Sequence, residues 1–192
     1  VYVDGELYSE KENACDVTHI ALGLKRAARI KCEFEFDAAA VPEEVYLVCE
    51  TPQSFDIRIN GEQKDLRDVG YFADSSFRKL AIDGLLHEGT NTVSLETFFS
   101  PSPQIYDDIE KSLLFESEKN KLTFDIEFES IYIAGNFSVK AGAEFKKLPR
   151  NALRCAGPFM IDKPVEKISL ANIEQQGYPF FSGRLTVTKT FD

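Results

Sequence analysis

Hydrophobic and polar residues alternate along several stretches of the chain, and this two-residue period predicts β-strands. In residues 29–36 (RIKCEFEF) every second residue is apolar and those between are charged. Such alternation gives a strand one apolar face and one polar face. The same pattern occurs in residues 44–50 (EVYLVCE) and 54–61 (SFDIRING). The latter ends in Asn60-Gly61, a dipeptide that tolerates the positive φ values of a tight hairpin turn.

More strands are predicted further along, at residues 77–82 and 91–99. Between them, residues 83–89 (DGLLHEG) predict a short helical turn that ends at Gly89 in a left-handed conformation. Residues 123–129 alternate again, with Phe124, Ile126 and Phe128 opposite acidic residues. Further candidate strands are residues 156–161, residues 166–170 and the stretch from Phe181 onward.

Two stretches break the strand period and predict helices. Residues 17–28 place Ile20, Leu24 and Ala27 or Ala28 at helical spacing, with Thr18 as a candidate cap, although Gly23 weakens the pattern. A helix near residues 103–114 is better supported. Ser102 can cap it, Pro103 suits its first position, and Ile105, Ile109 and Leu113 share one face.

Together these elements predict a mainly β fold, an antiparallel β-sandwich of jelly-roll type with one or two short helices. Residues 1–28 are expected to form an N-terminal extension or linker with a short helix. Residues 29–145 are expected to form the sandwich, including the helix near 103–114. Residues 146–192 are expected to form an extension with strands that could also begin a further sandwich.

Composition and charge exclude some partners. The chain has 192 residues, a formal net charge of −10 and a sequence pI near 4.8. Nucleic acids and anionic membrane surfaces both favour clustered Lys and Arg, so neither is an expected partner. No apolar run approaches the roughly 20 residues of a membrane helix.

The cysteines bear on the compartment. Cys15, Cys32, Cys49 and Cys155 form no CxxC pair, which disfavours zinc. Reduced, partly buried thiols are preferred over disulfides, and this favours a cytoplasmic location over secretion. The first residues lack the pattern of a signal peptide. Because the chain begins with Val1, however, a signal peptide on a longer parent protein stays open.

Standard catalytic motifs are missing from the sequence. It contains no GxSxG, HExxH, Walker loop or GxGxxG. His19 and His87 are expected to be surface residues. Asp125, Glu127 and Glu129 could supply the two carboxylates of a glycosidase, but a solvated outer strand face is preferred, because a strand face alone does not shift a pKa.

No cofactor is expected from the sequence. A structural calcium ion could use loop oxygens of Asp107 and Asp108, or of Asp65 and Asp68, but no spacing approaches an EF-hand loop. Acids at the start of a helix also account for the first pair without a metal.

Three extended segments carry a resemblance to a known family: residues 69–99, 119–139 and 175–191. They resemble the C-terminal non-catalytic region of large bacterial proteins classed as glycoside hydrolases, of the sugar-binding-domain or α-L-rhamnosidase-like kind. The resemblance covers nearly the whole chain but includes no catalytic signature. It implies a galactose-binding-like accessory module that follows a catalytic domain and has the other domains of the parent chain as partners.

The resemblance also gives the last residues two interpretations. In the family, the segment matching residues 177–192 opens a further jelly roll, so this strand would dock on the first sandwich or pair with another molecule, which would allow self-association. Alternatively, the strand closes the first sandwich as a native edge.

Carbohydrate binding needs aromatic ring faces beside polar groups. The chain has no tryptophan, and the candidates are Tyr71 and Phe72 in one cluster and Tyr178, Phe180 and Phe181 in another. Packing as core or interdomain filler is the preferred alternative for both clusters. The leading hypothesis is therefore a non-catalytic accessory module with a structural or interdomain role, followed by a genuine carbohydrate-binding module and then by a self-contained glycoside hydrolase.

Overall fold

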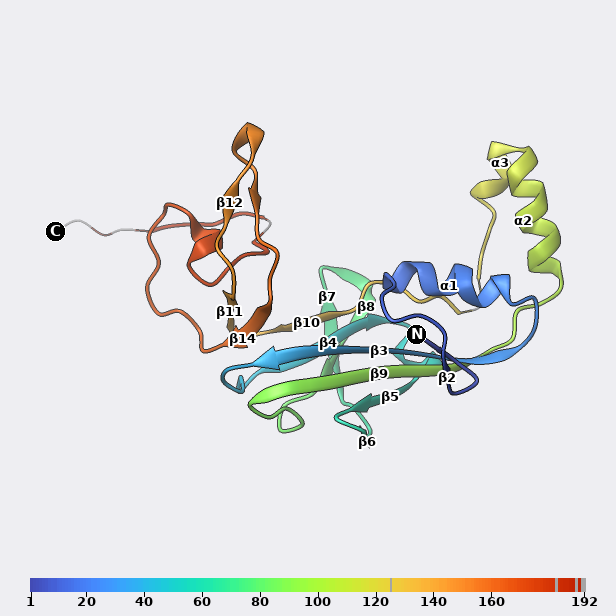
Figure 1. Ribbon diagram of the computed structural model, residues 1–192, viewed down its shortest axis with the longest axis horizontal. Coiled ribbons are helices and arrows are strands. Elements are labelled where there is room, and N and C mark those ends of the chain that lie inside the picture. The colour runs from blue at the N-terminus through green and yellow to red at the C-terminus, as the bar shows by residue number, and fades with distance from the viewer. Residues whose placement is uncertain (125, 182, 189, 191–192) are drawn as a thin grey trace. The chain divides into compact units, whose positions relative to one another are not determined.

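The chain forms two compact units. The computed structural model describes residues 1–124, 126–181, 183–188 and 190 (Figure 1). The first unit comprises Val1–Glu35, Glu43–Leu86 and Asn91–Gly135, and the second comprises Phe36–Pro42, His87–Thr90 and Asn136–Asp192. These bounds differ from the three consecutive segments expected from the sequence, because residues 1–28 belong to the first unit.

The first unit is mainly β. Its strands, two of which continue into the second unit, are β1 (Tyr2–Val3), β2 (Glu6–Leu7), β3 (Ala28–Ala38), β4 (Val45–Glu50), β5 (Asp56–Ile59), β6 (Glu62–Gln63), β7 (Asp68–Phe72), β8 (Asp74–Ala81), β9 (Gly89–Phe99) and β10 (Tyr132–Gly135). Strands β3, β9, β5 and β6 lie in this order in one sheet, and β1 pairs with both β2 and β3. A second sheet has the order β10-β4-β8-β7, with every pair antiparallel.

Alternation predicted the faces of these strands correctly. Along β3, Ile30 and Cys32 are buried whereas Arg29 and Glu33 are exposed. Strands β4 and β9 are more heavily buried, since their apolar residues pack in the interior. The expected mainly β, antiparallel architecture is therefore confirmed.

The predicted hairpin turn at Asn60-Gly61 joins β5 to β6. Both residues have positive φ, 52° and 79°, as a tight turn of this type requires. The Asn60 amide nitrogen donates to Leu85 O and to Asn91 Oδ1, both at 2.9 Å, and Asn60 Oδ1 accepts the Thr92 N–H at 2.9 Å. One side chain thus ties the hairpin to the start of β9. The helical turn expected at residues 83–89 is a non-helical turn instead, although Gly89 does have a positive φ.

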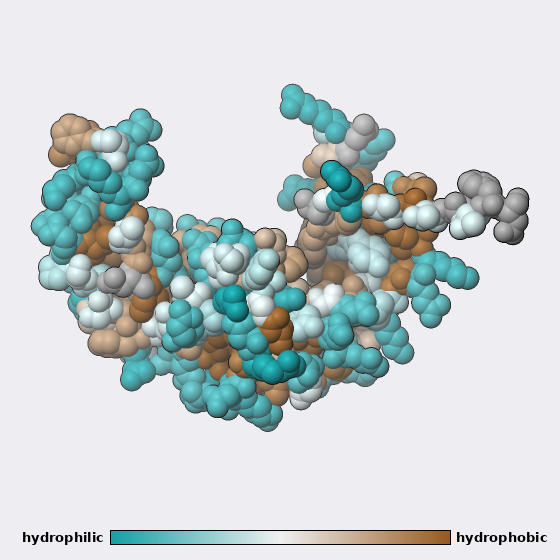
Figure 2. Space-filling view, turned by 180° about the vertical axis from the view of Figure 1, so that it is seen from behind, coloured by the Kyte–Doolittle hydropathy of each residue, from teal (hydrophilic) through white to brown (hydrophobic). Residues whose placement is uncertain are grey.

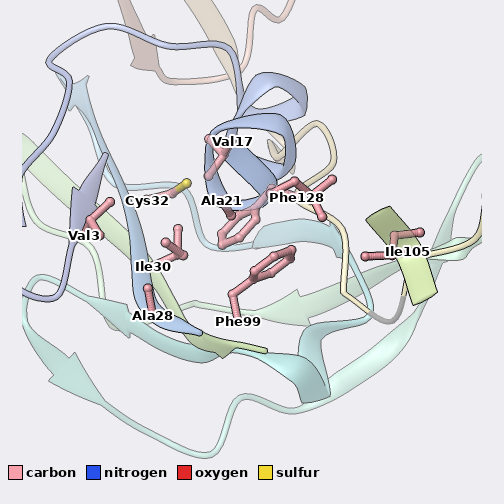
Figure 3. Close-up of a cluster of buried hydrophobic side chains, with 10 residues drawn as sticks. Val3, Val17, Ala21, Ala28, Ile30, Cys32, Phe99, Ile105 and Phe128 are labelled. Carbon is pink, nitrogen blue, oxygen red and sulfur yellow. The ribbon is translucent and has the colours of Figure 1, made fainter. Parts of the chain in front are cut away.

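The first helix, α1 (Ala14–Gly23), is part of the core rather than of a linker. It begins earlier than predicted, with Asn13 at the N-cap, so Thr18 lies in its interior. Its buried residues, Val17, Thr18, Ala21 and Leu22, are not those of the predicted face. Figure 3 shows Val17 and Ala21 of α1 beside Phe128, and the phenyl ring of Phe99 beneath them.

The second helix, α2 (Gln104–Leu114), confirms the prediction of a helix near residues 103–114. Pro103 occupies the N-cap position and Ser102 makes no side-chain cap. Ile105 is buried and Ile109 is partly buried against the core, but Leu113 points to solvent, which contradicts its expected place on the packed face. A short third helix, α3 (Glu116–Lys119), follows.

The second unit contains the strands β11 (Ser138–Ala141), β12 (Lys146–Lys147), β13 (Leu153–Arg154) and β14 (Phe159–Asp162). Strand β14 pairs with β11 in antiparallel and, in parallel, with the last residues of β3, which belong to this unit. Strands β12 and β13 form a separate hairpin.

Three predicted strands differ from the structure. Residues 123, 124 and 126–131 form no strand, although Phe128 is buried and Phe124 and Ile126 pack against the core, as their alternation predicted. Residues 166–170 form no strand either. In the terminal segment, the described residues 181, 183–188 and 190 also lie outside any strand, while residues 182, 189, 191 and 192 are outside the described part.

Candidate functional site

The aromatic residues proposed from the sequence lie in different units. Tyr71 and Phe72 lie on β7 in the first unit and are 58% and 46% exposed. The other three, Tyr178, Phe180 and Phe181, follow Gly177 in the second unit. Each group is therefore considered separately.

Phe72 belongs to an exposed cluster of rings in the first unit. Its ring centroid is 6.4 Å from that of Tyr132 on β10, and the Phe77 centroid on β8 is 5.9 Å from that of Tyr132. Tyr132 is 46% exposed, and Phe77 is half-buried. We call Phe72, Phe77 and Tyr132 the aromatic cluster. Tyr71 is not a member, because its partner across the ladder is Arg78.

Strand register assembles the aromatic cluster. Tyr132 pairs with Val48 of β4, and Val48 pairs with Lys79 of β8, so the three side chains share one face of the sheet. Two residues along, Phe77 pairs with Glu50 on the same face. Sequence analysis did not find Phe77 and Tyr132, because each is a single aromatic residue on a separate strand.

The same face continues past the aromatic cluster. Tyr46 precedes Val48 by two residues on β4, so its side chain lies on the same face, and it pairs with Ala81. The Lys79 ammonium lies 4.9 Å from the centroid of the Tyr46 ring, within the range of a cation–π interaction. Val48 is fully buried although it lies on the same side of the sheet as Tyr46 and Tyr132.

Three carboxylates, those of Glu50 on β4, Glu127 and Glu129, lie close enough to influence one another. Burial raises the pKa of Glu127, and the negative charges of Glu129 and Glu50 raise it further. Glu127 and Glu129, expected on a solvated outer strand face, are half-buried and lie outside any strand. Asp125, the third acid of that expected face, lies outside the described residues.

Two of the four acids considered for calcium, Asp68 and Asp108, are engaged with protein donors. Arg78 donates to both oxygens of Asp68, at 2.8 and 2.9 Å, and the Gly70 N–H also donates to Asp68. Asp108 accepts hydrogen bonds from Gln104 and Lys111. Among the described residues, no group of three or more His, Cys, Asp or Glu side chains is placed to hold a metal ion.

The remaining titratable candidates are spread out. His19 and His87 are both exposed. The four cysteines are free thiols, and burial raises the pKa of Cys32 to about 11 and that of Cys49 to about 12. Cys15 is exposed, and its thiol donates to Glu129 Oε2 at 3.6 Å.

In the second unit, the aromatic group is partly packed. The Phe180 ring contacts the Phe159 ring at a centroid distance of 4.8 Å, and the Phe181 N–H donates to Tyr178 O at 3.0 Å. Gly177 has a positive φ, and a Cβ there would lie 2.8 Å from side-chain carbons of Ser138 and Val165. This group therefore combines packing contacts with exposed surface, and it is the weaker candidate for binding.

Comparisons with protein-family models, with curated proteins and with solved structures find no match for this chain. Within the described residues, no helix is long and apolar enough to cross a membrane. On the face shown in Figure 2, hydrophilic residues predominate, with smaller hydrophobic areas between them.

Proposed function

We propose that this chain is a non-catalytic accessory module of a bacterial glycoside hydrolase, a jelly-roll β-sandwich that contacts carbohydrate through the aromatic cluster. The mainly β, antiparallel architecture and the resemblance of residues 69–99, 119–139 and 175–191 to such modules support the first part. The observation that carries the second part is the contact of the Tyr132 ring with the rings of Phe72 and Phe77, since Tyr132 and Phe72 are both well exposed.

The chemistry of the cluster suits a sugar. The faces of aromatic rings carry partial negative charge, which attracts the polarised CH groups of a pyranose. Glu50 lies opposite Phe77, and its carboxylate can accept hydrogen bonds from sugar hydroxyls. The partner that follows from this arrangement is a neutral glycan, because the carboxylates near the cluster and the net charge of −10 repel anionic polysaccharides.

An interdomain role has its own support. Leu113, Leu114 and Phe115, at the end of α2, are 78%, 75% and 63% exposed. Consecutive exposed apolar side chains on a soluble surface are typical of contacts with other proteins or domains. In the proposed parent protein, this end of α2 would contact another domain of the same chain.

The alternative of a self-contained glycoside hydrolase rests on Glu127. A general acid needs a raised pKa, and that of Glu127 is raised. Burial and two neighbouring carboxylates account for the shift without a catalytic role. If the chain is an enzyme, it releases reducing sugar from a glycan that it binds, and Glu127→Gln abolishes that release. Under the accessory-module proposal, the unmodified chain releases none.

The binding experiment uses calorimetry on a panel of neutral plant and host glycans, with two tyrosine variants as a matched pair. Tyr132→Ala removes the central ring of the aromatic cluster and is expected to weaken binding about tenfold. Tyr71→Ala removes a tyrosine that is also exposed but lies outside the cluster, and it is expected to leave affinity unchanged. Equal losses in the two variants would refute the assignment of the cluster as the binding surface, and loss only in Tyr178→Ala would move the site to the second unit.

A further inference from the structure

A pocket in the first unit is separate from the aromatic cluster and has a different chemistry. Its volume is about 230 Å³, roughly that of eight water molecules in the liquid. It lies between the end of α1, the connection from β9 to α2, the first turns of α2 and residues 123, 124 and 126. This size suits a fragment-sized molecule rather than an oligosaccharide.

The walls of the pocket combine apolar and polar side chains, and five of the apolar ones are large. Leu22, Phe99, Ile105, Phe124 and Ile126 contribute to them. Phe99 and Ile105 belong to the buried core, and Figure 3 shows Ile105 on α2 to one side of Phe99 and Phe128. Two sides of the pocket are therefore held by rigid secondary structure, which favours a preformed site.

Among the described residues that line the pocket, Asp108 is the one that carries a charge. Its Oδ1 atom accepts hydrogen bonds from Gln104 Nε2 at 3.0 Å and from Lys111 Nζ at 3.2 Å. These hydrogen bonds lower the pKa of Asp108, the one from Gln104 most, so the carboxylate is ionised at neutral pH. Its other oxygen, Oδ2, accepts no hydrogen bond from the part of the chain that the structure describes.

The charged groups at the pocket act in opposite directions. The N-terminus of α2 borders the pocket and carries about half a positive charge, which would favour an anion. Asp108 carries a negative charge, and its neighbour Asp107 lies in the first turn of α2. Lys111 pairs with Asp108 Oδ1 at 3.2 Å and offsets much of its charge, but Lys111 is not among the residues that line the pocket, so Oδ2 is the charged acceptor that a bound ligand would meet.

We propose that this pocket binds a small apolar molecule with a primary ammonium group, which donates a hydrogen bond to Asp108 Oδ2 while its hydrocarbon part lies against Phe124 and Ile126. The α1 C-terminus contributes to the same preference, since Leu22 in its last turn lines the pocket and the carbonyl end of a helix attracts cations. This proposal is independent of the proposed carbohydrate contact, because the two surfaces share no residue.

The experiment compares three probes of nearly equal shape: phenethylamine, 2-phenylethanol and phenylacetate. Each is titrated into the intact chain, with the methyl resonances of Ile105 and Ile126 followed by NMR. Phenethylamine is expected to bind in the millimolar range or tighter and to shift both methyl groups. The alcohol is expected to bind about tenfold more weakly, because a hydrogen bond between charged partners exceeds one with a neutral donor. Phenylacetate is expected to bind more weakly still. If phenylacetate binds as tightly as the amine, or if no probe shifts these methyl groups, the proposal is wrong.

A matched pair of variants tests the role of Asp108. Asp108→Asn keeps an acceptor for Gln104 but removes the charge, and it is expected to weaken phenethylamine binding about tenfold while changing 2-phenylethanol binding less than twofold. Asp107→Asn removes a charge from the same helix outside the pocket and is expected to have little effect. Equal effects of the two variants on the amine would show non-specific electrostatic attraction and overturn the proposal.

A variant that fills the pocket tests the binding site without changing Asp108, in case Asp108→Asn weakens binding only by disturbing the fold. Thr123 is an exposed residue of the pocket rim, so Thr123→Trp can occupy the space without disturbing the core. It is expected to abolish the methyl shifts with phenethylamine and leave the thermal midpoint close to that of the parent. Unchanged amine binding in this variant would place the ligand elsewhere. Glycan affinity should be the same in all three variants, which separates failure of this proposal from failure of the proposed function.

Discussion

The hydrogen bond from the Phe128 N–H to Thr18 Oγ1 provides a sensitive test of how the first unit is held together. The two residues are 110 positions apart, their donor–acceptor distance is 2.9 Å, and the bond is buried. Phe128 belongs to a segment without strand ladders, and its ring packs 5.0 Å from that of Phe55. The Thr18 hydroxyl is thus a specific anchor that holds this segment on α1.

The perturbation is Thr18→Val, which replaces the hydroxyl with a methyl group of similar size. Threonine and valine have similar helix propensities, so α1 itself should be little affected. A buried N–H left without an acceptor costs about 1–3 kcal/mol. The matched control, Thr18→Ser, keeps the hydroxyl and loses one methyl group, at a cost of about 0.8 kcal/mol.

The assay is urea unfolding, combined with hydrogen exchange of the Phe128 amide. Thr18→Val is expected to lower the free energy of unfolding by about 2 kcal/mol, a midpoint shift of roughly 1 M urea for a protein of this size. The Phe128 amide should exchange much faster in Thr18→Val than in Thr18→Ser. If Thr18→Ser is the more destabilising variant, or if Phe128 exchange is equal in both, the hydrogen bond does not anchor the segment and the reasoning is refuted.

Three further predictions concern packing, ionisation and thiol reactivity. A Cβ at Gly135 would overlap a neighbouring backbone carbonyl oxygen, so Gly135→Ala should lower the free energy of unfolding by about 2 kcal/mol. Gly23→Ala, in open space at the end of α1, should raise it by about 0.5 kcal/mol. Similar effects of the two variants would contradict the close contact between the Gly135 backbone and the neighbouring chain. The folded-state pKa of Glu127 is raised, so the folded state binds the proton more tightly and stability falls as pH rises through that pKa. Urea midpoints should therefore show Glu127→Gln to be more stable than the parent at neutral pH, with the gain disappearing near pH ~4; a gain that persists there would rule out ionisation as the cause. Ellman's reagent at mildly alkaline pH should label exposed Cys15 in the folded chain and buried Cys32 only after unfolding, because burial raises the pKa of Cys32 to about 11. Equal labelling rates of the two thiols in the folded chain would contradict the burial of Cys32.

The sequence predicted strands best where alternation coincides with sheet pairing. Residues 29–36 alternate and form part of β3, and Asn60-Gly61 forms the predicted turn. Alternation alone does not establish a ladder, however. Phe124, Ile126 and Phe128 face the core as predicted, yet their segment is held by packing and by a side-chain hydrogen bond rather than by strand pairing. Which strand pairs with which depends on contacts between distant residues, and period-2 patterns carry no such information.

The candidate site was less predictable than the fold. Phe72 was found because it lies in an aromatic stretch, but Tyr71, its neighbour in the sequence, is not part of the aromatic cluster. The register of β10, β4 and β8 brings Tyr132 and Phe77 together, and Phe72 on β7 joins them through its contact with Tyr132. Leu113 was predicted on the packed face of α2 from its helical spacing, but it is exposed, because among the described residues this end of the helix has no core residues against that face. In each case, the missing information is tertiary.

The most direct test of the proposed function is the difference in glycan affinity between Tyr132→Ala and Tyr71→Ala, measured by calorimetry on the neutral glycan that the unmodified chain binds best. The proposal predicts saturable binding that Tyr132→Ala weakens about tenfold and Tyr71→Ala leaves unchanged. Absence of binding across the whole panel, or equal affinity in the two variants, would contradict carbohydrate contact through Phe72, Phe77 and Tyr132.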